Sequence, residues 1–580
     1  MLVKRRESES TATLEYFHPV LHRIYTARGI KHESELATDL HALLPFDTLI
    51  DIDKACSRLE QALRSQERVL IIGDFDADGA TSTALAVSAL RVLGVQNVDY
   101  LVPNRFEFGY GLTPAIVAVA QSKAPSLIIT VDNGITSIEG VAAANTAGID
   151  VLITDHHLPA DALPAACAIV NPNQGGDTFP SKSIAGVGVI FYVMLAFRRH
   201  LQTVGWFEAQ GIAKPNMSQF LDLVALGTVA DVVGLDQNNR IMVSQGVHRI
   251  RKGYMRPGIA ALIAVAKRQP ERLRESDLGF AVAPRLNAAG RLDDMSLGIE
   301  CLLSETQAQA DALAQRLDGL NTERRRIETE MKEQALATLE KLVLAVESGT
   351  LPSALCLFDP SWHQGVIGVL AGRLKERYHR PVIVFAKASD TELKGSARSI
   401  TGVNIRDVLA AVDKSHPGLM TKFGGHAMAA GMSLHPDALP AFKTAFCAEM
   451  DVLMEGVADT QTLLTDGALV DEDLTQNLAK LLHEGGPWGQ QFPEPMFDNV
   501  FEILDQRLVG QHHLKLTLSL YPKGEPIDAI MFQVDLNAWP NHRAKFIHAV
   551  YKMDINTYQG RSRLQLIVVD MCVQEAAYEI

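Results

Sequence analysis

Three carboxylates crowd the stretch VLIIGDFDADGATS, residues 69–82, where Asp74, Asp76 and Asp78 directly follow an apolar run. Like charges this close repel one another, which raises the pKa values of the acids unless cations offset the charge. Carboxylate oxygens are the ligands that hard divalent ions such as Mg²⁺ and Mn²⁺ prefer. The spacing therefore predicts a divalent-cation site at the end of a strand.

Two later apolar runs also end in polar side chains. LIITVDNG ends at Asp132, and VLITDHH ends at Asp155, His156 and His157. A single carboxylate after a strand is often the N-cap of the next helix, and that reading fits Asp132 or Asp155 taken alone. It does not explain why acids and histidines recur at the same strand position. The imidazoles favour Mn²⁺ over Mg²⁺ as the bound ion.

A calcium loop is the rival interpretation of the first stretch, because DFDADG matches the start of an EF-hand. That loop needs Glu at its twelfth position, where this chain has Leu85. It also needs a preceding helix, where the apolar run predicts a strand. We therefore reject the EF-hand reading.

The elements around these residues follow a strand–helix rhythm. Apolar runs rich in β-formers lie at 69–73, 98–102, 126–131 and 150–154, and Ala-rich stretches with helical spacing separate them. Such alternation predicts a parallel sheet covered by helices on both faces. Ligands bind outside the carboxyl ends of the strands of such a sheet, so the acids should converge there. The region 184–265 is predicted to be mostly helical.

The remaining chain divides by composition. Residues 1–50 give little pattern, and 51–300 form the first domain. The stretch 301–346 is rich in Ala, Leu, Glu, Gln and Arg with few breakers, which predicts one or two long linking helices. ALCLFD and PVIVFA restart a strand–helix pattern in a second α/β domain, 347–455. Alternating strands from 463 to 580 predict a small β-barrel.

Composition sets broad limits on function. A length of 580 residues suggests about three domains or more. The net charge of −14 does not exclude nucleic acid, because a local basic groove can still bind a phosphate backbone. Six cysteines without a CxxC pair are expected to be reduced thiols in a cytoplasmic protein. Neither a signal peptide nor a membrane-spanning run is expected.

The motifs together resemble those of a known superfamily. GDFDADG, VDNG, TDHH and LGTVADVVGL, which contains Asp231, resemble the four metal-binding motifs of the DHH phosphoesterases. WHQGVIGVLAGRL, GSARS and FGGHAMAAG resemble the DHH-associated domain that closes over the active site. VPNRFEFGYGL and PRLNAAGRLDD narrow the resemblance to the single-strand-specific 5′→3′ exonucleases of that superfamily. Their fold is a parallel-sheet DHH catalytic domain, a linking helix, a smaller α/β DHH-associated domain and a C-terminal OB-fold β-barrel.

The resemblance implies a two-metal centre holding Mn²⁺ or Mg²⁺. Asp132 would bridge the ions, and Asp155 would orient a neighbouring histidine. His157 is either a ligand or a proton donor that faces the phosphate. Many smaller members carry a His where this chain has Leu70; Asp78 is the candidate to compensate, so its role stays open. The implied ligands are Asp74, Asp76, Asp78, Asp132, His156 and Asp231.

Arg, Asn and Gly residues within the motifs are the candidates for gripping the substrate. Arginine pairs well with phosphate oxygens, and glycine lets backbone N–H groups approach closely. His426 would touch the scissile group. For His363, a structural role is as consistent with the motif as a functional one. Phe106 and Phe108 would either stack on bases with Tyr110 or pack in the core. The substrate-binding candidates are Arg105, Tyr110, Arg285, Asn287, Arg291, Arg373, Ser396, Arg398, Gly424 and Gly425.

The resemblance implies hydrolysis of single-stranded DNA from its 5′ end, in recombination and in mismatch and other DNA repair. It also implies a helicase and a single-strand-binding protein as partners. We expect a monomer and no association with a membrane. One alternative is a DHH phosphodiesterase acting on short oligonucleotides or cyclic dinucleotides, although such substrates need no barrel. Another is a non-catalytic scaffold that binds single strands, although the acids and histidines of the motifs are all present.

Overall fold

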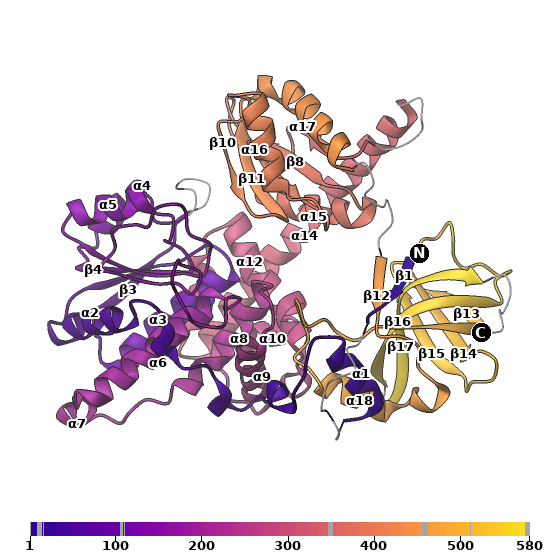
Figure 1. Cartoon of the computed structure of the whole chain (residues 1–580), viewed down its shortest axis with the longest axis horizontal. Helices are drawn as coiled ribbons and strands as arrows, with labels where there is room; N and C mark the ends of the chain where they lie inside the picture. Colours follow the sequence, from indigo (N-terminus) through magenta and orange to yellow (C-terminus); the bar gives the residue numbers. More distant parts are fainter. Residues whose placement is uncertain are drawn as a thin grey trace. The chain divides into compact units, whose positions relative to one another are not determined.

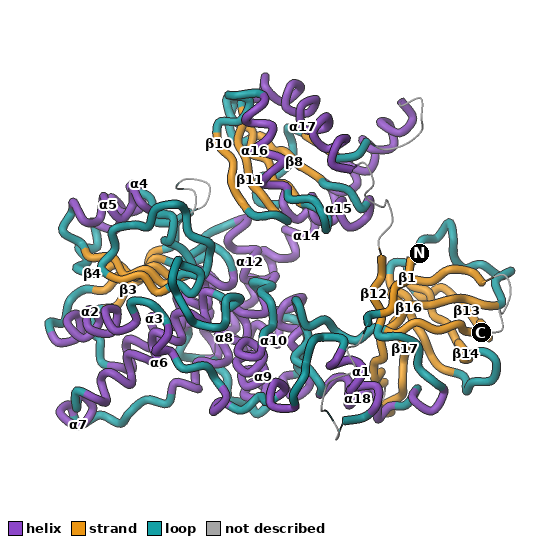
Figure 2. The backbone as a smooth tube through the Cα atoms, in the orientation of Figure 1, coloured by secondary structure: helices purple, strands orange, loops and turns teal. Residues whose placement is uncertain are grey.

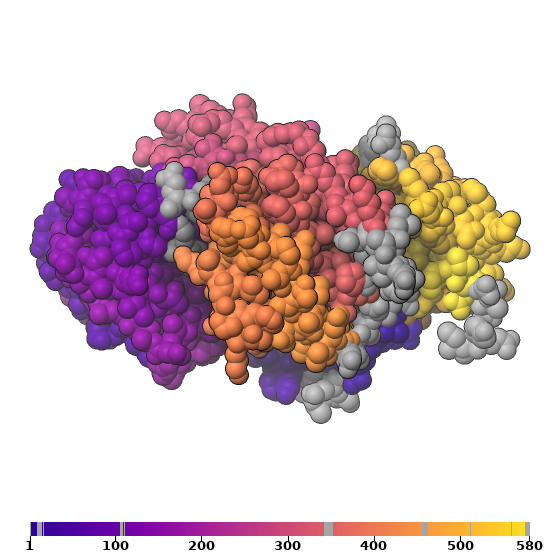
Figure 3. Space-filling model, turned by 90° about the horizontal axis from the view of Figure 1, so that it is seen from above, coloured from indigo at the N-terminus to yellow at the C-terminus, as the bar shows by residue number. Residues whose placement is uncertain are grey.

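The structure is a computed structural model that describes residues 2–7, 14, 17–104, 108, 111–345, 352–454, 462–510, 512–558 and 560–574. Contacts divide the chain into two compact units. Unit 1 comprises residues 3–318 together with 463–580, and unit 2 comprises residues 319–462. Figure 1 labels their elements, Figure 2 shows them by secondary structure, and Figure 3 shows their surfaces by position in the sequence.

The first domain of unit 1 is built on a parallel sheet, as predicted. The order is β3-β2-β4-β5-β6, and every neighbouring pair is parallel. The four predicted strands are confirmed, whereas β6 was not predicted because its run is only three residues long. The strands are β2 (Val69–Ile72), β3 (Val98–Leu101), β4 (Leu127–Val131), β5 (Asp150–Thr154) and β6 (Ala168–Val170).

Helices cover both faces of this sheet. On one face, α4 and α5 pack with the side chains of β2, β4 and β5 into one apolar core. On the other face, α3 packs against β2 and α6 against β4 and β5. Phe108 packs against the apolar core formed with α4 and α5, which favours a role in core packing over stacking on bases. The helices are α2 (Ile52–Arg64), α3 (Ala77–Leu93), α4 (Pro114–Gln121), α5 (Ile138–Thr146) and α6 (Gly186–Thr203).

The region after the sheet is helical, which confirms the prediction for 184–265. Its long helices α8 and α9 pack on one another, and α8 also packs on α3. A π-helical turn, Leu278–Val282, leads into α12. The helices are α7 (Trp206–Gln210), α8 (Leu221–Ala230), α9 (Gln237–Arg251), α10 (Pro257–Val265), α11 (Glu275–Asp277), α12 (Ala283–Leu292) and α13 (Ser296–Leu303).

One helix, α14 (Gln307–Ala345), leads from unit 1 into unit 2 and accounts for most of the predicted linking stretch. Unit 2 then forms a sheet in the order β10-β11-β9-β8-β7, in which only β7 and β8 pair in parallel. Its elements are β7 (Leu355–Phe358), α15 (Ile367–Tyr378), β8 (Val382–Lys387), β9 (Leu393–Arg398), α16 (Ile405–Ser415), β10 (Lys422–Gly425), β11 (Ala429–Leu434) and α17 (Leu439–Met454).

The C-terminal region returns to unit 1 as a closed barrel, which confirms the prediction of a β-barrel. Its strand order is β13-β14-β15-β17-β16, and α18 (Gln476–Glu484) precedes it. Apolar side chains alternate inward along β14, as expected for a barrel with a filled interior. The strands are β13 (Phe497–Val509), β14 (His513–Leu520), β15 (Ile527–Phe532), β16 (Phe546–Tyr558) and β17 (Arg561–Gln574).

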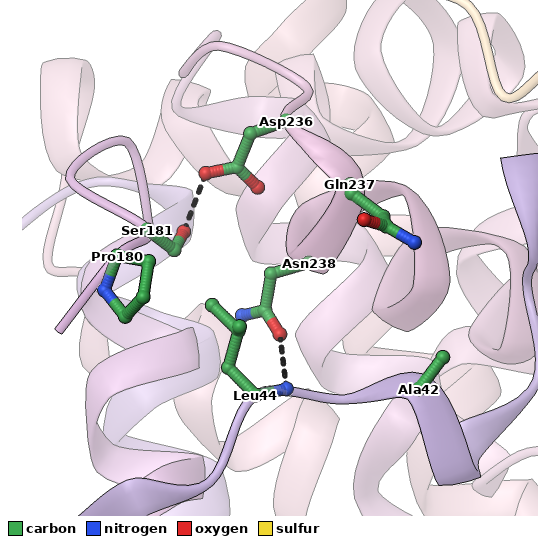
Figure 4. Close-up of a pocket in the computed structure, with 7 residues that line it drawn as sticks. All are labelled: Ala42, Leu44, Pro180, Ser181, Asp236, Gln237 and Asn238. Atoms are coloured by element: carbon green, nitrogen blue, oxygen red, sulfur yellow. Dashed lines mark hydrogen bonds between the residues drawn. The ribbon is translucent and has the colours of Figure 1, made fainter. Parts of the chain in front are cut away.

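The N-terminal segment, which gave little pattern, is held by contacts distant in sequence. Strand β1 (Leu2–Arg5) pairs with β12 (Thr462–Thr465), and α1 (Pro19–Thr26) brings Tyr25 into a stacked contact with Trp488. A pocket of about 170 Å³ opens where this segment meets α9; there the Leu44 N–H donates to Asn238 (Figure 4). None of the predicted metal ligands lines this pocket. Among the described helices, none is long and apolar enough to cross a membrane.

Candidate metal centre

Three strand ends bring the predicted acids to one edge of the parallel sheet. Ile72 of β2 pairs with Thr130 of β4, and Val131 of β4 pairs with Thr154 of β5. The loops that carry Asp74, Asp132 and Asp155 therefore start side by side. Asp132 itself has a φ of 62°, in the left-handed region. Backbone strain of this kind persists where the surroundings force it, and it is common at functional sites.

The side chains at this edge form three groups whose possible ligand atoms lie within 4.8 Å of one another. The groups share members, because Asp132 and His156 each belong to two of them. An arrangement of this kind suits two neighbouring divalent ions, and its mixture of carboxylate and imidazole donors fits Mn²⁺ or Mg²⁺. The groups are Asp74, Asp76 and Asp132; Asp78, His156 and Asp231; and Asp132, His156 and His157.

His156 is the link between the acids that follow the strands and the acid that follows helix α8. Its Nε2 lies 3.1 Å from Asp132 Oδ1 and 3.5 Å from Asp231 Oδ2. Asp231 directly follows α8 and caps its carboxyl end. Asp231 would read as an exposed helical acid if taken alone, and the helix packing places it at the sheet edge.

The electrostatics of these acids call for a cation. Burial raises the pKa of Asp132 well above its usual range, and the charges of Asp78 and Asp76 raise it further. Asp231 is shifted in the same direction, by burial first and then by the charge of Asp78. A divalent ion would offset this repulsion, because it favours the ionised form of every ligand.

Asp155 holds His157 rather than facing the other acids. Asp155 Oδ1 lies 2.7 Å from His157 Nδ1 and accepts the backbone N–H groups of His156 at 2.7 Å and His157 at 3.1 Å. Burial by itself would raise the pKa of Asp155, but the hydrogen bond with His157 and the nearby imidazoles hold it below its usual value. The same hydrogen bond raises the pKa of His157 against the effect of its burial. This geometry supports the predicted orienting role of Asp155.

Asp78 has a second function that the sequence did not indicate. Its Oδ2 accepts the N–H of Gly186 at 2.7 Å, and its Oδ1 accepts the N–H of Val187 at 2.9 Å. Both donors lie in the first turn of α6, where backbone N–H groups lack partners within the helix. Burial, together with the charge of Asp76, raises the pKa of Asp78 to about 7. Asp78 therefore anchors α6 to the centre, whether or not it also binds an ion.

Two glycines allow the elements around the centre to approach closely. A Cβ at Gly186 would lie 2.6 Å from Cβ of Asp132, and a Cβ at Gly227 of α8 would lie 2.9 Å from Asp78 Oδ1. Only glycine fits such positions without moving the acids. Gly227 lies in the LGTVADVVGL motif, but the motif does not show why this position must be glycine. For both residues that need arises from contacts between distant segments.

The substrate-binding candidates of unit 1 have different positions. Asn287 Oδ1 accepts the Ala77 N–H at 2.8 Å, so it steadies the first acidic loop. Arg285 is buried and forms an ion pair with Asp318 at 2.7 Å, which argues against the predicted contact with substrate because its charge is already neutralised. Arg291 is half-buried in the last turn of α12. Arg105, Phe106 and Tyr110 lie outside the described residues.

Unit 2 presents Ser396 and Arg398 next to the start of α15. Arg398 donates to Ser396 Oγ at 3.2 Å and to the Ala397 carbonyl at 2.8 Å, and both acceptors are neutral. A Cβ at Gly368, in the first turn of α15, would lie 3.0 Å from Ser396 Oγ and 3.1 Å from Arg398 Nη2. Burial lowers the pKa of Arg398. A guanidinium beside a helix N-terminus is suited to a phosphate group.

The other candidates of unit 2 are more exposed or serve local structure. Arg373 pairs with Glu328 at 3.0 Å, although its side chain is 57% exposed. Gly424, Gly425 and His426 are exposed: the two glycines end β10, where they pair with β11, and His426 begins the turn between these strands. His363 Nδ1 accepts the Gly365 N–H at 3.1 Å, which is consistent with its structural reading.

Comparison with known proteins shows three matching family models along the chain. The DHH family N-terminal domain matches residues 68–228, the DHHA1 domain matches residues 351–451, and the RecJ OB domain matches residues 465–570. These matches follow the order of the sheet domain, unit 2 and the barrel region.

Full-length relatives are similar along the whole chain. The single-stranded-DNA-specific exonuclease RecJ of Escherichia coli is 51% identical over 567 residues, which cover 98% of each chain. The protein of the same name from Haemophilus influenzae is 48% identical, again over 98% of each chain. A crystal structure of RecJ in complex with Mn²⁺ from Thermus thermophilus has a TM-score of 0.77 and 28% identity, over 96% of this chain and 76% of that chain. With about half of its residues identical over this length, and with matches to the DHH, DHHA1 and RecJ OB models, the chain belongs to the RecJ family of DHH proteins.

Proposed function

We propose that the protein is a metal-dependent exonuclease specific for single-stranded DNA, which it hydrolyses from the 5′ end. The observation that carries the proposal is the convergence of three ligand groups at one sheet edge, with shared members. The relatives named above, single-stranded-DNA-specific exonucleases, support the substrate. RecJ of Thermus thermophilus has been crystallised with Mn²⁺ and with Mg²⁺, which supports either ion as the cofactor.

We assign the ligand roles to Asp74, Asp76, Asp132, His156 and Asp231. Bound divalent ions would activate a water and offset the charge that grows on the phosphoryl oxygens. His157 keeps its Nδ1 toward Asp155. Its place in the group with Asp132 and His156 supports a role as a ligand or as a proton donor that faces the phosphate. Asp78 holds the start of α6 in place through two backbone hydrogen bonds.

We assign binding of the DNA phosphates to side chains of unit 2. Arg398 and Ser396 carry this assignment, because the hydrogen-bond acceptors of Arg398 are neutral and its charge is left for an anion. Arg373, Gly424, Gly425 and His426 are further candidates. The barrel would hold more of the strand, as OB-folds commonly do.

A labelled-strand assay tests the proposal. Single-stranded DNA labelled at the 5′ or the 3′ end is incubated with Mn²⁺ or Mg²⁺ and with wild type, Asp132→Asn or Asp437→Asn as control. Asp437 is an exposed acid of unit 2, with its side chain 93% accessible. We expect wild type and Asp437→Asn to release the 5′ label first, and Asp132→Asn to release neither label. Activity retained by Asp132→Asn would refute the metal centre, and earlier loss of the 3′ label would refute the polarity.

A comparison of substrate length separates this function from its alternatives. A phosphodiesterase for short oligonucleotides or cyclic dinucleotides would prefer a dinucleotide to a long single strand. A non-catalytic scaffold would bind the strand and leave it intact with either ion. We expect faster release of nucleotides from the long strand, which both alternatives forbid.

We further propose a cytoplasmic, monomeric enzyme that acts in recombination and mismatch repair beside a helicase and a single-strand-binding protein. The six cysteines are free in the structure, as expected for reduced thiols. Pull-down of the two partners on gapped DNA and sedimentation of the purified chain test this assignment.

A further inference from the structure

Two asparagines that belong to none of the recognised motifs lie in the segment NPN, residues 171–173, which directly follows β6. Asn171 is fully buried, and Asn173 is half-buried. Neither was singled out in the sequence, and neither is among the acids and histidines that form the metal groups. Their side chains instead reach the backbone of the two histidines at the metal centre.

Asn171 holds the turn at His157. Its Nδ2 donates to the His157 carbonyl at 2.9 Å, and its Oδ1 accepts the Asn173 N–H at 2.8 Å. Asn171 thus uses both ends of its amide, one on the histidine turn and one on its own loop.

Asn173 holds the same turn one residue earlier. Its Nδ2 donates to the His156 carbonyl at 2.6 Å and to the Lys182 carbonyl at 3.2 Å. Lys182 closes the loop from the other side, because its Nζ donates to the Pro172 carbonyl at 2.5 Å. The histidine turn is therefore tied to the segment that leads into α6, where Asp78 is anchored.

The histidine turn is fixed from two directions. Asp155 accepts the N–H groups of His156 and His157, and the two asparagines donate to the carbonyls of the same residues. The turn lies beyond the last paired residue of β5, Thr154, so no strand partner supplies these hydrogen bonds. A buried carbonyl without a partner is unfavourable, and side-chain amides can satisfy it.

The amide group has an electrostatic advantage here. It donates hydrogen bonds without carrying a charge, whereas a lysine or arginine would bring a positive charge close to the metal ions. Asn133, in the loop after β4, is used in the same way, because it donates to the carbonyls of Ile72 and Val131. Asn239 of α9 likewise donates to the carbonyls of Ser183 and Gly234.

We propose that Asn171 and Asn173 are positioning residues that set the direction of the His156 and His157 imidazoles toward the metal ions. They act through the backbone and touch neither metal nor substrate. The inference rests on the proposed metal centre, but its test measures metal binding directly and does not depend on the nuclease reaction.

The test is a titration of the metal-free full-length chain with Mn²⁺, in which electron paramagnetic resonance reports the free ion. The variants are Asn173→Ala, Asn171→Ala and, as matched control, Gln174→Ala. Gln174 lies in the same loop, is buried, and donates to a backbone carbonyl at 2.8 Å, but that carbonyl belongs to Ile169 of β6. Thermal unfolding without metal shows whether the three variants are folded and equally stable.

We expect each Asn variant to weaken Mn²⁺ binding about 10-fold, because the groups behind metal ligands typically contribute 10-fold or more to affinity. Gln174→Ala should bind as wild type does, and nuclease activity of the Asn variants should recover as Mn²⁺ is raised. Wild-type affinity in both Asn variants would overturn the inference, and so would an equal loss in Gln174→Ala. If wild type binds Mn²⁺ but leaves DNA intact, the proposed function is wrong. The Mn²⁺ affinities of the variants would still decide whether the asparagines position the histidines.

Should Asn171→Ala not fold, Asn173→Ala and Asn173→Ser decide the question, because Asn173 is partly exposed. The serine variant is too short to restore the hydrogen bond to His156 directly. It should therefore lose Mn²⁺ affinity as the alanine variant does, and wild-type affinity in both would overturn the role of Asn173.

Discussion

Asp78 lies among the predicted ligands, yet both of its carboxylate oxygens accept N–H groups from the first turn of α6. Anions are stabilised at helix N-termini, so this contact favours the ionised form. Burial and the neighbouring charge of Asp76 oppose it and raise the pKa to about 7. The acids of the centre are therefore costly to ionise without a cation.

This balance predicts a pH-dependent effect of metal on stability. In the metal-free folded chain Asp78 holds its proton up to about pH 7, whereas an unfolded Asp loses it near its usual value of about 4. The folded state therefore binds more protons between these values, and its stability falls as pH rises through that window. A bound ion removes this penalty.

Thermal unfolding with and without Mn²⁺ at pH 5.5 and pH 8 measures the effect. We expect a larger rise of Tm on adding Mn²⁺ at pH 8. Equal rises at the two pH values would contradict this account of the acids, and Asp132→Asn should show a reduced rise at pH 8.

The position of Arg398 leads to a prediction about how binding of single-stranded DNA depends on salt concentration. Its charge faces neutral acceptors, so a phosphate contact would add one released counterion to binding of a single strand. Arg398→Ala should weaken binding and lower the slope of log affinity against log salt by about 0.7. Arg326→Ala is the control, because Arg326 is exposed on α14 and already pairs with Glu323. Fluorescence anisotropy of a labelled strand measures the affinity and its salt slope, with each variant made in the Asp132→Asn protein to prevent cleavage. Equal slopes for Arg398→Ala and Arg326→Ala would rule out the phosphate contact.

Helices α3, α6 and α8 carry the centre by packing closely on one another. Their approach depends on glycines rather than on apolar interdigitation alone. Gly227 faces Thr81 of α3, where a Cβ would lie 2.3 Å from the Thr81 Oγ1. A helix interior normally disfavours glycine, so its presence in α8 reflects this contact.

Gly227 and Gly319 both lie within helices, but they should respond oppositely to substitution by alanine. Gly227→Ala should lower the free energy of unfolding by about 1–3 kcal/mol through overpacking, and it should weaken Mn²⁺ binding because it pushes on Asp78. Gly319 in α14 has nothing within 4 Å of its missing Cβ. Gly319→Ala should raise stability by up to about 1 kcal/mol. Urea unfolding tests both, and a neutral Gly227→Ala would show that α3 and α8 can separate freely.

The N-terminal segment joins the barrel region to the helices of unit 1. Arg28 donates to Asp466 at 2.7 Å with both side chains almost fully buried, and it lies over the ring of Trp488. Arg240 of α9 lies over Phe492 of the same connecting segment, 4.3 Å from the ring centroid. The barrel is thus attached through a chain of arginines and aromatic rings.

Removing Arg28 should release this attachment. Arg28→Ala removes the nearer partner of the buried Asp466 and leaves it with Arg6, at 3.8 Å. This loss should lower the free energy of unfolding by about 3–5 kcal/mol. Lys54→Ala is the control, because Lys54 is 69% exposed and its pair with Asp51 should contribute at most about 1 kcal/mol. Limited proteolysis should cut near residue 490 in the Arg28 variant first. Equal resistance in both variants would contradict the attachment.

The sequence by itself determined the local features. The runs at 69–73, 98–102, 126–131 and 150–154 are strands because buried parallel strands are continuously apolar, and their polar ends indicated the metal centre. The alternation of strands and helices predicted the parallel sheet, and the alternating apolar residues of the C-terminal strands predicted the barrel. Both predictions were possible because each pattern has a period that is visible over a short stretch of sequence. The N-terminal segment gave no such pattern, since its contacts with Asp466 and Trp488 are far away in sequence.

Only the tertiary structure decided how individual side chains are used. Arg285 and Arg398 look alike in their motifs, but Arg285 forms an ion pair with Asp318, whereas Arg398 donates to the neutral oxygens of Ser396 and Ala397. Asp78 acquires its hold on α6, and Asn171 and Asn173 their hold on the histidine turn, from segments distant in sequence. A partner's identity, its distance and its burial set the strength of each interaction, and none of these is encoded in the spacing of a motif.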